Sequence, residues 1–238
     1  MVESEETEKE GSKPEQPPTE YNTTKPKKTL TNNEILANAI LFLLAGSETT
    51  ATTLGWVSYF LALNPDVQER LIQELDTVLD KHNGEITYEA VNEMSYMDMV
   101  INETLRMCPA ALRLDRVCNK DYTYENIKIP KGQIWSLCIY ALHYDPELYP
   151  EPEKFDPERF NEDNKKKREN EAFMPFGTGP RNCIGMRFAL LEIKFLISTI
   201  LSKYKFNKCD ETPVNLFFFC YFLKFFEKIF FGLGNNKN

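Results

Sequence analysis

Histidine and basic residues are scarce in this sequence of 238 residues. Its 2 histidines, His82 and His143, are too few for a metal centre built from several histidines. They also offer few candidates for the histidine of a catalytic triad. Lys and Arg number 28 against 36 Asp and Glu, which gives a net charge of −8. This balance argues against the broad basic surface of a nucleic-acid-binding protein, so nucleic acid is not an expected partner.

Paired cysteines are also missing. The six cysteines are scattered and form no C-x-x-C pair: Cys108, Cys118, Cys138, Cys183, Cys209 and Cys220. Neither a zinc site nor a disulfide framework is therefore expected. A reducing compartment, or the cytosolic side of a membrane, is the expected location.

Apolar residues are nearly absent from the first 30 positions. Residues 1–30 hold seven acidic residues, five lysines, four prolines and a single aromatic residue, Tyr21. Such a segment buries too little apolar area to offset the entropy of ordering, so we expect it to be a disordered or loop segment. No apolar run follows Met1, so no signal peptide or N-terminal membrane anchor is expected in this chain.

Helical patterns begin at a capping box, Thr31 to Glu34. No proline follows until Asn64-Pro65, which predicts one helix of about 30 residues. The apolar run 35–46 is also typical of a transmembrane span, but Glu48 and several hydroxyl residues in the middle would be costly in lipid. We favour a helix buried in a globular core and keep a membrane span as the alternative.

The remaining pattern predicts a mainly α fold with a small β component. Helices are expected at 65–81, 87–94, 95–107 and 186–204, and short strands at 122–124, 127–129 and 134–140. Residues 145–175 are rich in proline and charge, which favours a meandering loop. The tail 214–238 is atypical and rich in phenylalanine: its segment 216–233 fits a segment on a membrane or an amphipathic helix, and an aberrant C-terminus is an equally favoured alternative.

One segment carries a pattern typical of ligand binding, and it runs from Phe176 to Gly185, directly before the last predicted helix. A thiolate is the metal-binding form of cysteine and is favoured at a helix N-terminus, where Cys183 is placed. Glycines let the backbone curl closely around a flat ligand, and Arg181 supplies a cation for an anionic group on that ligand. A glycine-rich turn with an inert cysteine is the structural alternative.

The segment resembles the haem loop of the cytochrome P450 superfamily, F-x-x-G-x-R-x-C-x-G, which is matched at Phe176, Gly179, Arg181, Cys183 and Gly185. Other family signatures follow in the family's order at 45–50, 103–106 and 157–160. Segments 151–155 and 185–190 are similar to the microsomal family 3 and its clan. The resemblance covers 31–213 and implies the C-terminal half of the fold: the long central helix, the E-x-x-R helix, short strands, the meander, the haem loop and the final helix.

The resemblance also implies roles for individual residues. Cys183 would be the thiolate ligand of the iron of haem b, and Arg181 and Arg116 would pair with haem propionates. The long helix would loosen over the distal haem face, where Glu48 and Thr49 would relay protons. A network of Glu103, Arg106 and Arg159 would hold the haem-binding fold without taking part in catalysis.

The implied function is an NADPH- and O2-dependent oxidation of a lipophilic small molecule at the cytosolic face of the endoplasmic reticulum membrane. Electrons would come from NADPH-cytochrome P450 reductase, with cytochrome b5 as a further donor. Family members are roughly twice as long as this chain, which implies a truncated form. Without the missing helices, the long helix is expected to expose apolar residues. The tail does not resemble the strand pair that closes the family fold. The alternative is a non-catalytic fragment or pseudogene product that binds haem weakly or not at all.

Overall fold

The computed structural model describes residues 29–167, 169–210, 212 and 232–235. The predicted disordered segment and most of the phenylalanine-rich tail lie outside the described residues. The chain divides into two units, residues 1–40 and 41–238. In the first unit the predicted capping box is confirmed, since the Thr31 amide donates to Glu34 Oε2 at 2.8 Å and the Glu34 amide donates to Thr31 Oγ1 at 3.3 Å.

The predicted mainly α fold with a small β component is confirmed. The helices are α1 (Asn32–Leu63), α2 (Pro65–Lys81), α3 (Tyr88–Glu93), α4 (Ser95–Met107), α5 (Ile139–His143), α6 (Glu162–Lys167) and α7 (Met186–Leu201). Three 3-10 turns are η1 (Pro157–Phe160), η2 (Asn170–Ala172) and η3 (Gly179–Arg181). The strands are β1 (Leu114–Val117), β2 (Tyr122–Tyr124), β3 (Ile127–Ile129), β4 (Ile134–Leu137), β5 (Tyr204–Asn207) and β6 (Gly232–Asn235).

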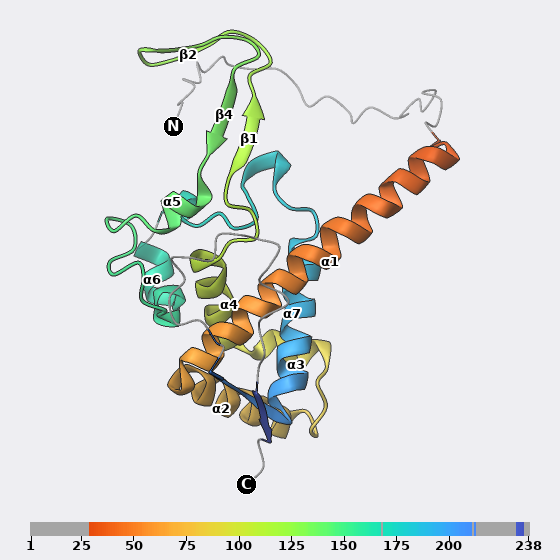
Figure 1. Cartoon of the computed structure of the whole chain (residues 1–238), viewed down its shortest axis with the longest axis vertical. Coiled ribbons are helices and arrows are strands. Elements are labelled where there is room, and N and C mark those ends of the chain that lie inside the picture. The colour runs from red at the N-terminus through yellow and green to blue at the C-terminus, as the bar shows by residue number, and fades with distance from the viewer. Residues whose placement is uncertain (1–28, 168, 211, 213–231, 236–238) are drawn as a thin grey trace, which may run out of the picture. The chain divides into compact units, whose positions relative to one another are not determined.

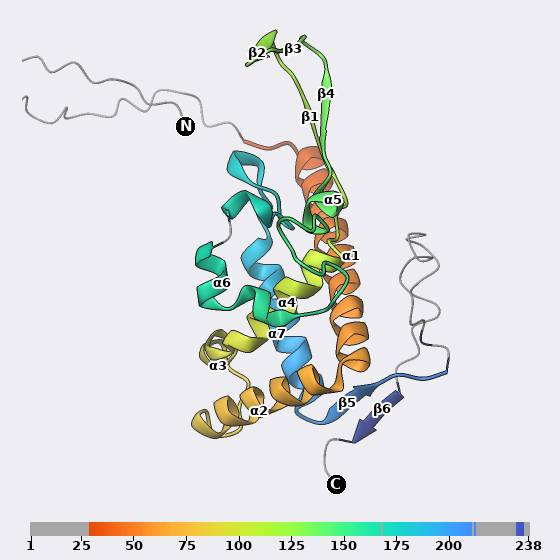
Figure 2. The same ribbon diagram turned by 90° about the vertical axis from the view of Figure 1, so that its left-hand side faces the viewer.

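The core of the second unit joins the C-terminal half of α1 to α2, α3, α4 and α7 (Figure 2). The apolar stripe of α2 places Leu71 and Leu75 in this core with no exposed surface. Helix α4 begins where the Glu74 carboxylate accepts the amides of Tyr96 and Met97 at 2.7 and 2.9 Å. These contacts fix α4 against α2.

Helix α1 is buried only in its second half. Burial begins at Thr50 and continues through Val57 and Leu61, but 32–49 are exposed, with Leu43 at 69%. The prediction of a helix buried along its length is therefore wrong for the first half, while the predicted exposure of apolar residues on it is confirmed. α1 is also long and apolar enough to be a candidate membrane span. Core helices of soluble proteins and signal sequences meet the same criterion, so it does not separate a core helix from a membrane span.

The strands form two-stranded antiparallel ribbons. β1 pairs with β4, with Leu114 opposite Leu137. β2 pairs with β3 in a second ribbon, which lies at the far end of the β1–β4 ribbon (Figure 1). The strand predicted at 134–140 is wrong beyond Leu137, because the chain turns there and α5 buries Ile139. β1 has no counterpart among the predicted strands.

Two predictions near the C-terminus also need correction. The helix predicted to reach residue 204 ends at Leu201, and Tyr204 begins β5. β5 pairs antiparallel with β6, so residues 232–235 of the tail form one strand of a pair although the tail sequence does not resemble the strand pair that closes the family fold. The meander, predicted as loop, contains η1, α6 and η2, with α6 started by the Asn161 side chain, which accepts the Asn164 amide at 2.9 Å.

Candidate functional site

Cys183 lies on the loop that runs from Met174 to α7. Backbone hydrogen bonds within this loop fold it back on itself. The Cys183 amide donates to the Phe176 carbonyl at 2.9 Å, and the Gly177 amide donates to the Met174 carbonyl at 3.0 Å. The Asn182 amide donates to the carbonyl of Gly179 at 3.1 Å. These bonds place the Cys183 backbone beside that of Phe176, three residues before α7 begins.

Two glycines of this loop adopt a backbone conformation that other residues rarely take. Gly177 and Gly179 have φ values of +74° and +71°. A Cβ added at Gly177 would also lie 3.3 Å from Leu114 Cδ1, so the loop passes tightly against β1. Gly185, the residue before α7, has φ −88°, and a Cβ there would meet Cys183 Sγ at an ordinary 4.0 Å.

The loop and α1 face one pocket of about 270 Å³. Cys183, Arg181 and Phe176 line it from the loop, and Thr49 lines it from α1. The remaining lining residues come from α1, α4, the segment leading into β1, the first residue of β1, the loop and α7: Thr50, Thr53, Leu105, Ala110, Ala111, Leu114, Pro175, Gly177, Ala189 and Ile193. A thiol and a hydroxyl more than a hundred residues apart in the sequence thus line the same pocket.

The chemistry of this lining fits a haem group. Haem is a flat apolar ring that needs one axial sulfur or nitrogen ligand and has carboxylate groups on its rim. The walls are mostly apolar, and they contain one thiol, Cys183, and one guanidinium, Arg181. These are the groups that would hold the iron and pair with a propionate.

The proposed proton-relay residues differ in position. Thr49 lines the pocket and its hydroxyl donates to the Ala45 carbonyl at 2.7 Å, whereas Glu48 is exposed and is not among the lining residues. Helix α1 is continuous from Asn32 to Leu63, so the expected loosening around Glu48 and Thr49 is wrong for this structure. Hydroxyl groups bond carbonyls one turn back while the helix itself stays intact.

Arg116 does not line the pocket. It is exposed on β1, and its Nη1 donates to the Asp115 carbonyl at 2.9 Å. Because side chains two residues apart share one face of a strand, Arg116 lies on the same face as the pocket residue Leu114, one pleat further along.

The structure brings Glu103, Arg106 and Arg159 together. Arg106 Nε lies 2.7 Å from Glu103 Oε2, with neither side chain exposed, and Arg159 Nε lies 3.4 Å from Glu103 Oε1. Arg106 also donates to the carbonyls of His143 and Pro152 at 2.9 and 2.8 Å. Burial raises the pKa of the Glu103 carboxyl, and its hydrogen bond and ion pair with Arg106 oppose that rise.

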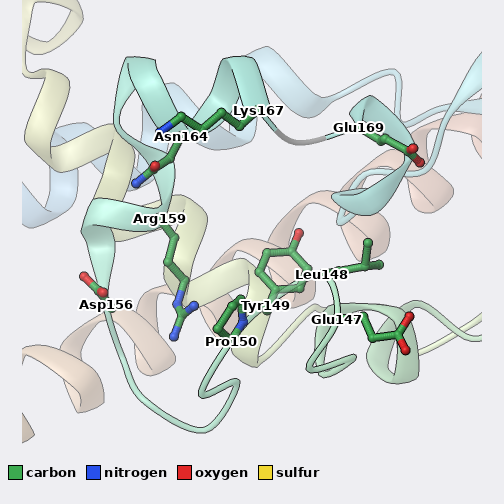
Figure 3. A pocket seen from close by; sticks show the side chains of 9 residues that line it. All are labelled: Glu147, Leu148, Tyr149, Pro150, Asp156, Arg159, Asn164, Lys167 and Glu169. Carbon is green, nitrogen blue, oxygen red and sulfur yellow. The ribbon is translucent and has the colours of Figure 1, made fainter.

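A larger pocket of about 580 Å³ lies on the meander (Figure 3). Arg159 and Asp156 line it, together with Tyr149, whose hydroxyl donates to the Ala172 carbonyl at 2.8 Å. It shares no lining residue with the Cys183 pocket and carries side chains of both charges. We therefore place the candidate site at the smaller pocket, where the thiol is.

Sequence reasoning missed several lining residues. Leu114, Ala111 and Thr53 are brought to the pocket by tertiary packing and carry no local signal. Ala189 and Ile193 do carry one, since they are four residues apart on α7 and therefore share the helix face that follows Cys183.

Comparisons with known proteins show which family this chain is similar to. The family model described as Cytochrome P450 matches residues 15–221. Over 189 residues the chain is 47% identical to "Cytochrome P450 3A2" of Rattus norvegicus and 46% identical to "Cytochrome P450 3A7" of Homo sapiens, covering 79% of this chain and 37% of each relative. It is 44% identical to "Cytochrome P450 3A29" of Sus scrofa over 191 residues, 80% of this chain and 38% of that relative.

The chain thus spans less than two fifths of the length of these relatives. The matched region contains the Cys183 loop, the buried Glu103–Arg106 pair and the long helix that lines the pocket. On this evidence the chain belongs to the cytochrome P450 family of haem monooxygenases and is of the family 3 type.

Proposed function

We propose that this chain binds haem b in the Cys183 pocket and forms part of a monooxygenase that oxidises a lipophilic small molecule. The observation that carries the proposal is that Cys183, Arg181 and Thr49 line one pocket with mostly apolar walls. When bound, haem supplies the activation of O2, and thiolate ligation favours cleavage of the O–O bond.

In this proposal each residue has a separate task. The Cys183 thiolate holds the iron, and the guanidinium of Arg181 pairs with a propionate. Arg116, one pleat beyond Leu114 on β1, pairs with the other propionate. Phe176, Gly179 and Gly185 shape the loop around the ring.

Proton delivery is assigned to Thr49 and Glu48. Thr49 lines the pocket, and its Oγ1 donates to the Ala45 carbonyl, which leaves the lone pairs of the hydroxyl able to accept a further hydrogen bond. Glu48, the preceding residue, exchanges protons with solvent because its carboxylate is exposed. The pair would hold and pass a proton at Thr49 Oγ1.

The resemblance supports the partners of the proposed reaction. Electrons come from NADPH through NADPH-cytochrome P450 reductase, with cytochrome b5 as a further donor, and O2 is the co-substrate. The proposed location is the cytosolic face of the endoplasmic reticulum membrane.

A second candidate is a non-catalytic chain that binds haem weakly. The exposure of Leu41, Phe42, Leu43 and Leu44 on α1, each between 59 and 69%, favours it, because a large apolar surface next to the site promotes association and weakens haem retention.

A carbon-monoxide difference spectrum of the reduced, haem-reconstituted chain separates the candidates. The proposal predicts a thiolate-type spectrum that Cys183→Ser abolishes, while Cys138→Ser, at another exposed cysteine, retains it. A thiolate-type spectrum in Cys183→Ser would refute the ligand assignment. Absence of haem binding in the unchanged chain would favour the non-catalytic candidate.

A further inference from the structure

His143 connects the buried arginine of α4 to the root of the Cys183 loop. The residue ends α5 and has no exposed surface. Its Nδ1 lies 3.1 Å from the Arg106 carbonyl oxygen, and its Nε2 lies 3.1 Å from the Met174 amide nitrogen. The Arg106 guanidinium in turn donates to the His143 carbonyl at 2.9 Å.

These partners determine which ring nitrogen carries the proton. A backbone amide can only donate, so Nε2 must accept the Met174 N–H and is unprotonated. A carbonyl can only accept, so Nδ1 must carry the hydrogen that it donates to Arg106. The His143 imidazole is therefore neutral with its proton on Nδ1.

Aromatic neighbours hold the ring in this orientation. Phe173 stacks on it with ring centroids 5.3 Å apart and planes inclined by 26°, and Tyr149 packs edge-on at 6.3 Å. Both hydrogen bonds thus start from a ring whose position is fixed by packing.

Met174 is where this connection reaches the candidate site. It is buried, with 6% exposed, and its carbonyl accepts the Gly177 amide. Two residues later the Phe176 carbonyl accepts the Cys183 amide. Cys183 itself is exposed, as are Gly179 and Arg181, so the loop has its buried anchor at Met174.

We propose that His143 is a positioning residue: its neutral ring joins the Arg106 backbone to the Met174 amide and thereby sets where Cys183 lies in the pocket. The proposal rests on the proposed role of Cys183 as haem ligand. It adds a residue outside the haem loop that controls the loop's position.

Two variants separate the two hydrogen bonds. His143→Asn keeps a donor near the Nδ1 position and loses the acceptor for Met174, whereas His143→Gln places an amide oxygen near the Nε2 position and loses the donor to Arg106. His82→Gln is the control, because His82 lies at the end of α2 and contacts Glu93 at 3.1 Å, away from the loop.

The first measurement uses the haem-free chain, so it does not depend on haem binding. Hydrogen exchange at the Met174 and Cys183 amides should accelerate about tenfold or more in His143→Asn, while core amides of α4 keep the protection seen in the control. His143→Gln should restore much of the protection. Equal exchange in both variants and the control would overturn the positioning role.

The second measurement is the carbon-monoxide spectrum after haem reconstitution. His143→Asn should lower the fraction of bound haem with a thiolate-type spectrum several-fold, and His143→Gln should recover it. The proposal fails if, in both variants, the fraction of bound haem with a thiolate-type spectrum falls only in proportion to the loss of stability measured by the urea midpoint. His143 would then have a merely structural role. If the unchanged chain gives no thiolate-type spectrum, the proposed function fails, and the exchange data still decide the positioning role.

Discussion

Arg106 contacts both carboxylate oxygens of Glu103 in a pair that has no exposed surface: Nε to Oε2 is 2.7 Å and Nη2 to Oε1 is 2.9 Å. Ions buried in this way gain from their mutual attraction and from further hydrogen bonds, here to backbone carbonyls. Removal of one partner leaves the other charged and buried.

Arg106→Met should therefore destabilise the chain by roughly 3–5 kcal/mol, measured from urea unfolding. The double variant Glu103→Leu with Arg106→Met should lose less, because the only charge of the network that remains is Arg159, which is partly exposed and also donates to the Glu151 carbonyl. Arg187→Met, at an exposed arginine of α7, is the control. A single-variant loss no larger than that of the control would contradict the burial argument.

Alanine substitution of two glycines should have opposite effects on stability. Gly177→Ala forces a side chain into φ +74° and 3.3 Å from Leu114 Cδ1, with an expected loss of at least about 1–2 kcal/mol. Gly46→Ala removes a helix-interior glycine with nothing within 4 Å of the added Cβ, so a gain of about 0.5–1 kcal/mol is expected. Urea midpoints that shift in the same direction would show that the loop is not held as described.

Acid should weaken the contact between η1 and α2. Hydrogen bonds from Asn161 and from Arg70 hold the pKa of the Glu158 carboxyl below its usual 4.5. A lowered folded-state pKa stabilises the fold above pH 4.5, and the stabilisation is lost as pH falls further. Both partners are partly exposed, so only about 0.2–1 kcal/mol is involved.

Urea unfolding from about pH 7 to about pH 3 tests this linkage. The unchanged chain should lose more stability over this range than Glu158→Gln, which has no carboxylate to protonate. Glu153→Gln, at an exposed carboxylate, should behave like the unchanged chain. Parallel pH curves for all three would rule out the contribution of Glu158.

Thr49→Ala should divert electrons from product to peroxide. The variant removes the hydroxyl that lines the Cys183 pocket and leaves the loop intact. With haem, reductase, NADPH and a lipophilic substrate, peroxide formed per NADPH should rise several-fold at unchanged haem content. Thr52→Ala is matched, since Thr52 donates to the Glu48 carbonyl but does not line the pocket. An equal rise in both variants would argue against a proton-delivery role for Thr49.

Local signals predicted the helices well. The Thr31–Glu34 capping box, the proline at position 65 and the Thr87 cap each lie at the start of an observed helix. β1 escaped prediction because Leu114–Val117 has two adjacent charged residues at its centre and only one β-branched residue, and its pairing with β4 is a long-range contact. The end of β4 was misjudged because burial of Ile139 is a tertiary effect.

The candidate site was predictable where the residues form a fixed spacing, as in the loop from Phe176 to Cys183. The predicted network of Glu103 and Arg106 is present and fully buried, but the carbonyls that accept from Arg106 come from α5 and the meander and carry no signal in the sequence. The haem contacts of Arg116 and the proton relay stay predictions. Neither Arg116 nor Glu48 lines the pocket.

The side chain of Gln68 acts on β5 as a neighbouring strand would. Its Nε2 donates to the Phe206 carbonyl at 2.9 Å and its Oε1 accepts the Phe206 amide at 2.7 Å. Because both backbone groups of Phe206 point to Gln68, the Phe206–Leu233 pair of the β5–β6 ladder must be a non-hydrogen-bonded one. At Phe206 β5 is therefore covered along both edges, which blocks another chain from adding a strand to β5 at this position.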